Sequence, residues 1–407
     1  MSEEKLVPKL RFSGFTDEWN EVTLNDVATF SKGKGISKND ISNYGIECVR
    51  YGELYTKYNE MIYNIESKTD LNKNELKLSE KNDILMPCSG ETAIDLATAS
   101  CIQKDQVAIG GDITVIKTNQ YAPFITYYLN QKKTEIAKYA QGVSIVHLYP
   151  KDFKVMNIRI PSINEQKMII GLLEEITKKE QLLESKYQQY QEYKKYLMQQ
   201  IFTQKLRFDD NCQYKTKQVK DFLIESKIEG IDDINKRLTV KLNLKGITVR
   251  ESKTIEIEGA TKQFIRKTGQ FIYGKQNLHK GAFGIIPKEL DGYLTSSDIP
   301  SFDFKGGIEP KWFYYYFARK SFYEKLENLS TGTGSKRISP KEFLNIKIIV
   351  PEFKEQHKIV CLLEKFDEKI NGISNQIVQM NMFKKSLLQQ MFVVQLILSL
   401  LQNKKHI

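Results

Sequence analysis

Two stretches of this 407-residue sequence repeat each other. Residues 150–202 read PKDFKVMNIRIPSINEQKMIIGLLEEITKKEQLLESKYQQYQEYKKYLMQQIF, and residues 340–392 read PKEFLNIKIIVPEFKEQHKIVCLLEKFDEKINGISNQIVQMNMFKKSLLQQMF. At an offset of 190 residues the two stretches align without a gap, and 19 of the 53 columns are identical. Self-similarity at a fixed offset indicates a duplicated structural unit.

A shorter repeat opens each half of the chain. The tetrapeptide KLRF occurs at residues 9–12 and again at residues 205–208. Between the repeats the halves diverge, and residues 31–148 and 227–338 share little beyond the Asp-Ile pairs at 112–113 and 298–299. The chain therefore alternates a variable block with a shared segment, twice. This order predicts one duplicated scaffold that carries two different functional surfaces.

Each shared segment is predicted to become helical after its proline, Pro161 or Pro351, because proline is rare inside helices. Apolar residues then recur at alternating spacings of four and three, which is typical of a coiled-coil seam. Each helix would have about 40 residues and a length of about 60 Å. The seam positions are Ile169, Leu173, Ile176, Glu180, Leu183, Tyr187, Tyr190, Lys194, Leu197 and Ile201, then Ile359, Leu363, Phe366, Ile370, Ile373, Ile377, Met380, Lys384, Leu387 and Met391.

A heptad helix alone is typical of a dimerisation arm. Duplication within one chain favours an intramolecular antiparallel pair instead, because the two seams can satisfy each other. Such a pair would hold the variable blocks apart, one at each end. Lys194 and Lys384 occupy the same seam position. Either they fix the register of the helices, as polar seam residues can, or this end of the seam is open to water, and the sequence leaves both interpretations open.

The variable blocks are predicted to be mixed α/β domains. Each block contains β-branched, strand-like runs and ends in a longer helical pattern that begins with proline. The predicted strands are 46–51, 83–86 and 113–117 in the first block and 238–242, 254–257 and 271–273 in the second, and the predicted helices are 123–140 and 310–329.

No catalytic motif is found in the sequence. Residues 330–336 (STGTGSK) lack the GxxxxGK[ST] spacing of a phosphate loop. There is no GxSxG, no HExxH and no NPPY-like tetrapeptide, and the four histidines are too scattered to predict a metal site. The five cysteines, Cys48, Cys88, Cys101, Cys212 and Cys361, form no CxxC pair, so we expect reduced, buried thiols.

The net charge of +11 favours a polyanionic partner. This charge is uneven: residues 1–150 hold 17 basic and 20 acidic side chains, whereas residues 204–340 hold 25 and 17. If the first block binds nucleic acid, it must use a local basic patch. Residues 1–11 have no apolar signal-peptide core, and the apolar run at 391–401 is shorter than the roughly 18 residues of a spanning helix. We therefore expect a soluble, cytoplasmic protein.

Small, hydroxyl and basic residues form the candidate binding sites. The loop SKGKG at 31–35 and the segment 330–337 combine small residues with cations that could approach phosphates. Arg50 and Arg266 could read guanine in a major groove. The candidate DNA-binding residues are Lys32, Lys34, Arg50, Tyr51, Ser89, Ser144, His147, Lys262, Arg266, Lys275, Thr331, Thr333, Ser335, Lys336 and Arg337.

The sequence resembles the DNA-specificity (S) subunits of type I restriction-modification systems over nearly its whole length. The resemblance rests on the opening LRFxGFxxxW at 10–19, the LxDV segment at 24–27, and the paired PxxxEQxxI segments at 161–169 and 351–359. It also rests on the KKxLxQQxF segments at 194–202 and 384–392. The paired segments are the specific signal, because each one ends a variable block and starts a heptad helix.

The resemblance implies two target-recognition domains, each reading half of a bipartite site in double-stranded DNA. The helices would set the unread gap and dock two methyltransferase subunits, which carry S-adenosylmethionine. Two restriction subunits that use ATP and Mg would join them, and this chain would hold no cofactor, metal or catalytic residue. The alternatives are a stand-alone, divergent methyltransferase or nuclease and a coiled-coil scaffold that binds only proteins.

The predicted fold is therefore α+β, with a pseudo-twofold internal repeat. Two mixed α/β recognition domains are separated by two long helices packed as an antiparallel coiled coil. The expected boundaries are 1–163 for the first domain, 164–203 for the first spacer helix, 204–353 for the second domain, 354–395 for the second helix and 396–407 for a tail. The tail departs from the family pattern, and it could extend the seam, pack on the first domain or be irregular.

Overall fold

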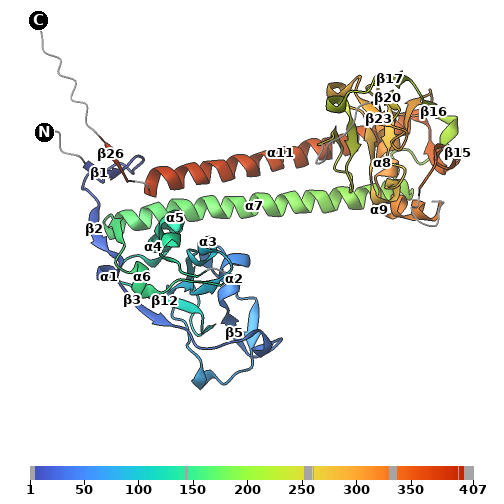
Figure 1. Ribbon diagram of the computed structural model, residues 1–407. Coiled ribbons are helices and arrows are strands. Elements are labelled where there is room, and N and C mark those ends of the chain that lie inside the picture. Colours follow the sequence, from blue (N-terminus) through green and yellow to red (C-terminus); the bar gives the residue numbers. More distant parts are fainter. Residues whose placement is uncertain are drawn as a thin grey trace, which may run out of the picture. The chain divides into compact units, whose positions relative to one another are not determined.

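The computed structural model describes residues 5–142, 145–251, 259, 261–329, 337–392 and 394–397 (Figure 1). The chain forms two compact units. Unit 1 comprises residues 1–183 and 376–407, and unit 2 comprises residues 184–375. Each unit thus combines one variable block with part of each long helix, α7 (Ile163–Phe202) and α11 (Phe353–Phe392). Within the described residues no helix is long and apolar enough to cross a membrane.

Unit 1 is built on a five-stranded sheet of order β3-β12-β8-β10-β6 and a four-stranded sheet of order β11-β5-β7-β4. Its remaining strands are β1 Lys5–Pro8, β2 Asn20–Thr23, β9 Ser89–Gly90, β13 Val146–His147, β14 Asn157–Ile160 and β26 Val394–Ile397. The sheet strands are β3 Ala28–Lys32, β4 Ile41–Ser42, β5 Ile46–Val49, β6 Met61–Ile62, β7 Ser67–Thr69, β8 Ile84–Pro87, β10 Ser100–Ile102, β11 Ala108–Ile109 and β12 Ile113–Thr118. The short helices are α1 Leu24–Val27, α2 Tyr51–Thr56, α3 Ala93–Leu96, α4 Ala122–Gln131, α5 Lys133–Ile136 and α6 Pro150–Phe153.

Unit 2 repeats this plan with a smaller sheet of order β16-β24-β21-β22. In both units the first strand pairs with the last, and the last pairs with a middle strand, all antiparallel. The strands are β15 Tyr214–Gln218, β16 Leu223–Ser226, β17 Glu229–Gly230, β18 Leu238–Val240, β19 Ile247–Val249, β20 Gln263–Ile265, β21 Phe271–Tyr273, β22 Phe283–Ile285, β23 Leu294–Ser296, β24 Ser301–Phe304 and β25 Lys347–Pro351. The short helices are α8 Pro310–Phe317, α9 Lys320–Tyr323 and α10 Pro340–Leu344.

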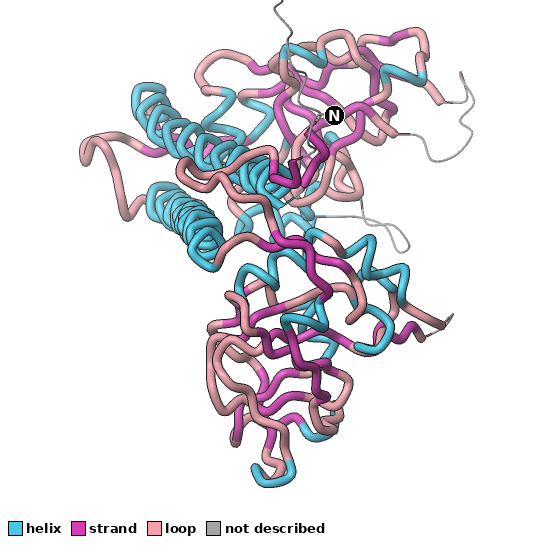
Figure 2. The backbone as a smooth tube through the Cα atoms, turned by 90° about the vertical axis from the view of Figure 1, so that its left-hand side faces the viewer, coloured by secondary structure: helices cyan, strands magenta, loops and turns pink. Residues whose placement is uncertain are grey.

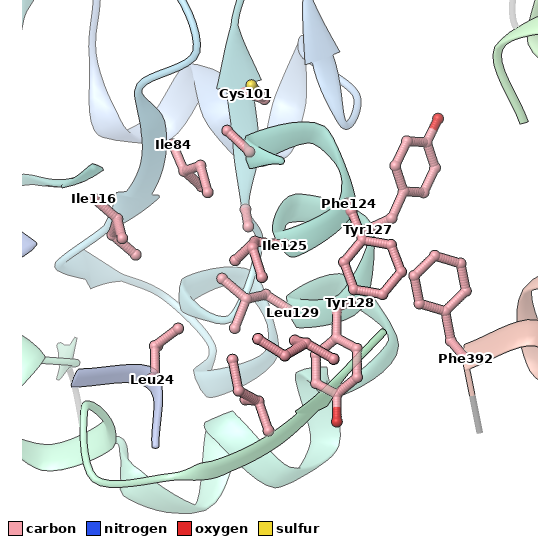
Figure 3. Close-up of a cluster of buried hydrophobic side chains, with 14 of the residues drawn as sticks. Leu24, Ile84, Cys101, Ile116, Phe124, Ile125, Tyr127, Tyr128, Leu129 and Phe392 are labelled. Atoms are coloured by element: carbon pink, nitrogen blue, oxygen red, sulfur yellow. The ribbon is translucent and has the colours of Figure 1, made fainter. Parts of the chain in front are cut away.

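Each core lies between a sheet and the long helices. In unit 1, helix α4 places Phe124 against the sheet side chains and stacks its ring on Phe392 of α11 at a centroid distance of 5.2 Å (Figure 3). In unit 2, helix α8 places Trp312 against Phe202 of α7 at 5.9 Å. Stacked and edge-to-face contacts of this kind add to the free energy of apolar burial.

The long helices lie side by side (Figure 2), and the residues that they share in each core show that they pack antiparallel in each unit. In unit 1 the start of α7, with Ile169 and Leu173, shares a core with Leu387 and Met391 near the end of α11. In unit 2 the end of α7, with Ile201, shares a core with the start of α11. The other predicted seam residues are buried or half-buried: Ile176, Leu183, Tyr187, Tyr190, Leu197, Ile359, Leu363, Phe366, Ile370, Ile373, Ile377 and Met380. The predicted α+β class with its antiparallel helix pair is confirmed.

The Glu-Gln dipeptides at 165–166 and 355–356 tie each helix start to its own unit. Gln166 Oε1 accepts from the Tyr121 backbone N–H at 3.0 Å, and its Nε2 donates to the Pro161 carbonyl at 2.9 Å. Gln356 repeats both bonds, accepting from the Glu309 N–H at 2.8 Å and donating to the Pro351 carbonyl at 3.0 Å. Because these glutamines are buried, the bonds also satisfy polar groups that would otherwise be unpaired.

The KLRF repeats clamp the helix ends. In unit 1 the Arg11 guanidinium donates to both oxygens of the buried Glu165, at 2.7 and 2.8 Å, and the Leu10 N–H donates to the Gln390 carbonyl at 3.0 Å. In the second half of the chain the Leu206 N–H donates to the Gln200 carbonyl at 3.1 Å, the equivalent bond. The repeat is therefore a structural element that joins the end of one long helix to the start of the other within a unit.

Two predicted helices differ from the structure. The helix predicted over 123–140 breaks after Gln131, because Lys132 leaves the helical conformation and Lys133 turns to donate to Thr98 Oγ1 at 2.9 Å. The helix predicted over 310–329 breaks at Arg319, whose backbone is extended and whose guanidinium packs 4.1 Å from the Tyr316 ring centroid. The strand predicted over 254–257 lies outside the described residues.

The second long helix is predicted to reach residue 395, but α11 ends at Phe392. Residues 394–397 instead form β26, which pairs antiparallel with β1, with Lys5 opposite Ile397 (Figure 1). The apolar, β-branched composition of this segment favours a strand once a partner strand is present. Residues 394–397 therefore do not continue the helical seam.

Candidate nucleic-acid interface

One edge of the five-stranded sheet gathers the candidate residues of unit 1. Strand β12 is antiparallel to both β3 and β8, so the end of β3, the start of β12 and the end of β8 meet at the same edge. Lys32 ends β3, and its ammonium lies 3.7 Å from the Asp112 carboxylate, just before β12. Lys34 follows, with its N–H bonded to the Ile109 carbonyl at 2.9 Å. Both lysines are therefore presented from an ordered backbone.

Gly33 explains why this loop is rich in small residues. A Cβ at Gly33 would lie 2.0 Å from the Gly110 carbonyl oxygen, so only glycine allows the two backbones to approach this closely. A Cβ at Gly35 would meet nothing within 4 Å. The first glycine therefore has a steric role that the second lacks.

Arg50 and Tyr51 line a cavity of about 600 Å³ beside this loop. The Arg50 N–H donates to Glu53 Oε2 at 3.0 Å, and its guanidinium lies 3.6 Å from Glu53 Oε1. Glu53 is buried and also accepts from Ser67 Oγ at 2.5 Å. Although burial opposes ionisation, the hydrogen bonds from Ser67, Arg50 and Lys57 hold the pKa of Glu53 below its usual value. A buried carboxylate thus positions the arginine, a role that the sequence analysis missed.

Ser89 and His147 lie on two short paired strands, β9 and β13. The Ser89 hydroxyl and His147 Nδ1 are 3.1 Å apart, and the His147 ring stacks on Tyr149 at 5.8 Å. The neighbouring Cys88 N–H donates to the Asp112 carbonyl at 2.7 Å, which joins this pair to the edge that carries Lys32. The six described candidates of the first block therefore share one region of unit 1. Ser144 lies outside the described residues.

The equivalent edge of unit 2 carries a basic groove. It lies where β16 ends, β21 ends and β24 begins, and it has a volume of about 580 Å³. Lys262 and Lys275 line it, as the sequence analysis expected for binding residues, together with Lys227 and Lys341. Lys262 also forms an ion pair with Glu229. Lys227 directly follows the first sheet strand of its unit and Lys32 is the last residue of the corresponding strand, so both lysines lie at the end of that strand.

Arg337 lies beside the same edge. Its guanidinium is 3.1 Å from Asp298 Oδ1, and the Lys275 N–H donates to the Asp298 carbonyl at 2.9 Å. Both side chains of this ion pair are about half exposed, so a phosphate could compete for the arginine. The candidates Thr331, Thr333, Ser335 and Lys336 lie outside the described residues.

The proposal that Arg266 reads a base is not supported by the structure. Arg266 is 1% exposed, and its guanidinium donates to Thr295 Oγ1 at 2.5 Å, Ser301 Oγ at 2.7 Å and the Ile299 carbonyl at 3.1 Å. Burial lowers the pKa of Arg266 to about 10. Its hydrogen-bonding capacity is used inside the domain, so we correct its role to a structural one.

The cysteine expectation needs one correction. Cys48, Cys88, Cys101 and Cys212 are buried free thiols, whereas Cys361 on α11 is exposed. Its position on the outer side of the helix, away from the seam, accounts for the difference.

Comparison with known proteins identifies the fold and the family. The family model described as "Type I restriction modification DNA specificity domain" matches residues 16–192 and 213–380. The type I restriction enzyme MjaVIII specificity subunit of Methanocaldococcus jannaschii is 28% identical over 140 residues, which cover 33% of this chain and about a third (32%) of that relative.

Two solved structures share the fold over nearly the whole chain. The S subunit of a type I restriction-modification system from M. genitalium gives a TM-score of 0.60 at 15% identity and covers 96% of this chain and 100% of that one. A chain from a structure of complex assembly and conformational transition in the type I R-M system gives 0.54 at 12% identity, with 94% and 99% coverage. The chain belongs to the family of type I restriction-modification DNA specificity proteins and carries two copies of the family's domain.

Proposed function

We propose that this chain is the DNA sequence-specificity subunit of a type I restriction-modification complex. Each unit would read one half of a bipartite site in double-stranded DNA. The observation that carries the proposal is that the same edge of the duplicated sheet presents cations in both units, although the two blocks differ in sequence. Lys32 and Arg50 represent this edge in unit 1, and Lys275 and Arg337 represent it in unit 2.

The two sheet edges would contribute to the free energy of DNA binding in different ways. The unit 2 groove is lined by four lysines within a block that has an excess of basic residues, so it would contribute more of the salt-dependent attraction to phosphates. The unit 1 edge combines fewer cations with Arg50, whose guanidinium lies 3.6 Å from Oε1 of the buried Glu53. An arginine guanidinium is suited to bidentate contact with guanine.

We further propose that this chain performs no catalysis. Two methyltransferase subunits that bind S-adenosylmethionine would dock on the long helices, and two restriction subunits that use ATP and Mg would join them. The helices would set the unread gap between the half-sites, and the complex would act in the cytoplasm. The backbone hydrogen bonds of Leu10 and Leu206 are made to equivalent positions of the two long helices, so each unit would offer an equivalent docking surface. This duplication supports two copies of one partner subunit.

The test is co-expression with the neighbouring methyltransferase gene, followed by mapping of methylated adenines in genomic DNA. The proposal expects one bipartite motif with an unread gap. Replacing residues 31–148 should change one half of that motif, and replacing residues 227–338 should change the other. Binding of S-adenosylmethionine by the purified chain would favour a stand-alone methyltransferase. A stable protein complex that neither binds nor methylates DNA would favour the protein-binding scaffold.

A further inference from the structure

The two seam lysines are partly buried and paired within their own units. In unit 2, Lys194 of α7 forms an ion pair with Asp367 of α11. In unit 1, Lys384 of α11 forms an ion pair with Glu180 of α7 at 3.0 Å. The two lysine side chains are only 15% and 19% exposed. Of the two interpretations that the sequence left open, a seam end open to water is not what the structure shows, because both lysines are paired and mostly enclosed.

The carboxylates come from positions that are not equivalent in the repeat. At the offset of 190 residues, Asp367 corresponds to Thr177, and Glu180 corresponds to Ile370. The two acidic positions are three residues, or about one helical turn, apart. Each copy thus has one carboxylate, in one of two places that a lysine can reach. The ion pair is present in both units although its acidic residue has moved by a turn.

The pair in unit 2 is also joined to the recognition domain. The Tyr315 hydroxyl of α8 donates to Asp367 Oδ2 at 2.6 Å, and the Lys194 ammonium lies 4.9 Å from the Tyr315 ring centroid. In unit 1 the residue equivalent to Asp367 is Thr177, whose hydroxyl donates to the Leu173 carbonyl of the same helix at 2.9 Å.

We propose that these lysine–carboxylate pairs, together with the helix-end contacts of the KLRF repeats, fix the register in which α7 and α11 pack, and thereby the length of the unread gap. The second part rests on the proposed function. An apolar heptad seam tolerates a slip of seven residues, or about 10 Å, whereas a polar seam residue with one partner does not. A slip in either direction would place Lys194 opposite residues that carry no charge: Val360 and Leu363, or Ser374 and Ile377.

The register can be measured without DNA or partners. Spin labels on K195C and K369C, two exposed positions of unit 2, report the distance between the helices. A C361S background is needed because Cys361 is exposed. We expect one distance in the parent protein and a second population in K194L/D367L. This variant should fold, because the Asp367 side chain is 40% exposed and replacing even a buried ion pair by apolar residues is often neutral or stabilising. A single, unchanged distance in K194L/D367L would overturn the proposal.

Moving the carboxylate provides the matched control. D367T places threonine where the first copy has Thr177, and we expect it to lower Tm by about 2–4 °C, the shift for a loss of about 1 kcal/mol in a unit of this size. D367T/I370E places the carboxylate where the first copy has Glu180, and it should restore at least half of that loss and keep one spin-label distance. Failure of I370E to restore Tm would show that Lys194 does not use the alternative position.

The gap is measured by methylation mapping of the co-expressed complex. We expect one gap length for the parent and for D367T/I370E, and more than one for K194L/D367L. A changed distance distribution with an unchanged gap would overturn the link between register and gap. If the parent complex gives no bipartite motif, the proposed function fails, while the spin-label distances still decide whether the pairs fix the register.

Discussion

The duplication allows one substitution to be compared at two equivalent sites, Glu165→Gln and Glu355→Gln. Glu165 is 1% exposed and accepts two charge-assisted bonds from Arg11, which is itself 14% exposed. Removing one partner of a buried ion pair costs about 3–5 kcal/mol, and the partial exposure of Arg11 favours the lower end. Since 1 kcal/mol shifts Tm by about 2–4 °C in a unit of this size, E165Q should lower Tm by about 6–12 °C.

Glu355 should tolerate the same change. Its Oε1 accepts from the Phe208 N–H at 2.8 Å, and its Oε2 has no hydrogen-bond partner among the described residues. Arg207, the counterpart of Arg11, donates instead to the Gln204 side chain at 2.8 Å. The amide oxygen of glutamine can keep the backbone bond. E355Q should therefore cost no more than about 1 kcal/mol, or about 4 °C.

Each unit contains one buried tryptophan, which makes the assay specific. Trp19 lies in unit 1 and Trp312 in unit 2, and neither indole N–H has a partner among the described residues. The variants W312F and W19F should thus lose no hydrogen bond and leave one fluorescent reporter per unit. Thermal unfolding of E165Q in the W312F background and of E355Q in the W19F background gives the two shifts. A loss in E355Q as large as that in E165Q would refute the reasoning.

Four further results are expected. Under native conditions Ellman's reagent should titrate one thiol, Cys361, because the other four are buried and burial raises the pKa of Cys101 to about 12; a second fast thiol would contradict this. In the assembled complex, G33A should weaken methylation at sites that depend on the first half of the motif, whereas G35A should not, since only the Gly33 Cβ meets backbone; equal effects would count against the close approach. If Lys275 and Arg337 both touch phosphates, K275A/R337A should reduce the magnitude of the slope of log K for DNA binding against log salt by about 2. K369A is the control and should leave this slope unchanged. An unchanged slope in K275A/R337A would exclude both residues as phosphate contacts. The pKa of Glu53 is depressed in the folded state, so its contribution to folding stability is present above about pH 4.3 and is lost as the pH falls through the folded-state pKa. The unfolding free energy of E53Q should therefore fall less than that of the parent between pH 7 and pH 3. Parallel curves of unfolding free energy against pH would contradict this prediction.

The scaffold could be predicted from the sequence because its long helices carry a periodic pattern of apolar residues. Seam residues such as Ile169 and Leu363 repeat every seven residues, and a pattern of this length has few structural interpretations. The ends of the shorter helices could not be predicted where tertiary contacts decide them. The helix predicted from Pro310 breaks at Arg319 because that guanidinium packs on aromatic rings from α7, α8 and α9.

The candidate site was predicted less well because residue type does not reveal burial. Arg50 and Arg266 are the same residue type in similar blocks and each lines a cavity, yet Arg266 is only 1% exposed and its guanidinium donates to Thr295 and Ser301. The role of Glu53 was not predicted because no sequence pattern distinguishes a buried carboxylate from an exposed one. Its role depends on Ser67, which lies on strand β7, whereas Glu53 lies in helix α2.

The repeated glutamines suggest why the scaffold stays alike while the blocks diverge. Gln166 and Gln356 bond almost wholly to backbone groups, and the residues that supply the N–H groups, Tyr121 and Glu309, differ in type. A clamp made to the backbone does not depend on which side chains the variable block carries. The side chains at the sheet edge are then free to differ, as Arg50 in one unit and the lysine-lined groove in the other do. The same interactions that fix each domain to its helices therefore leave its recognition surface open to change.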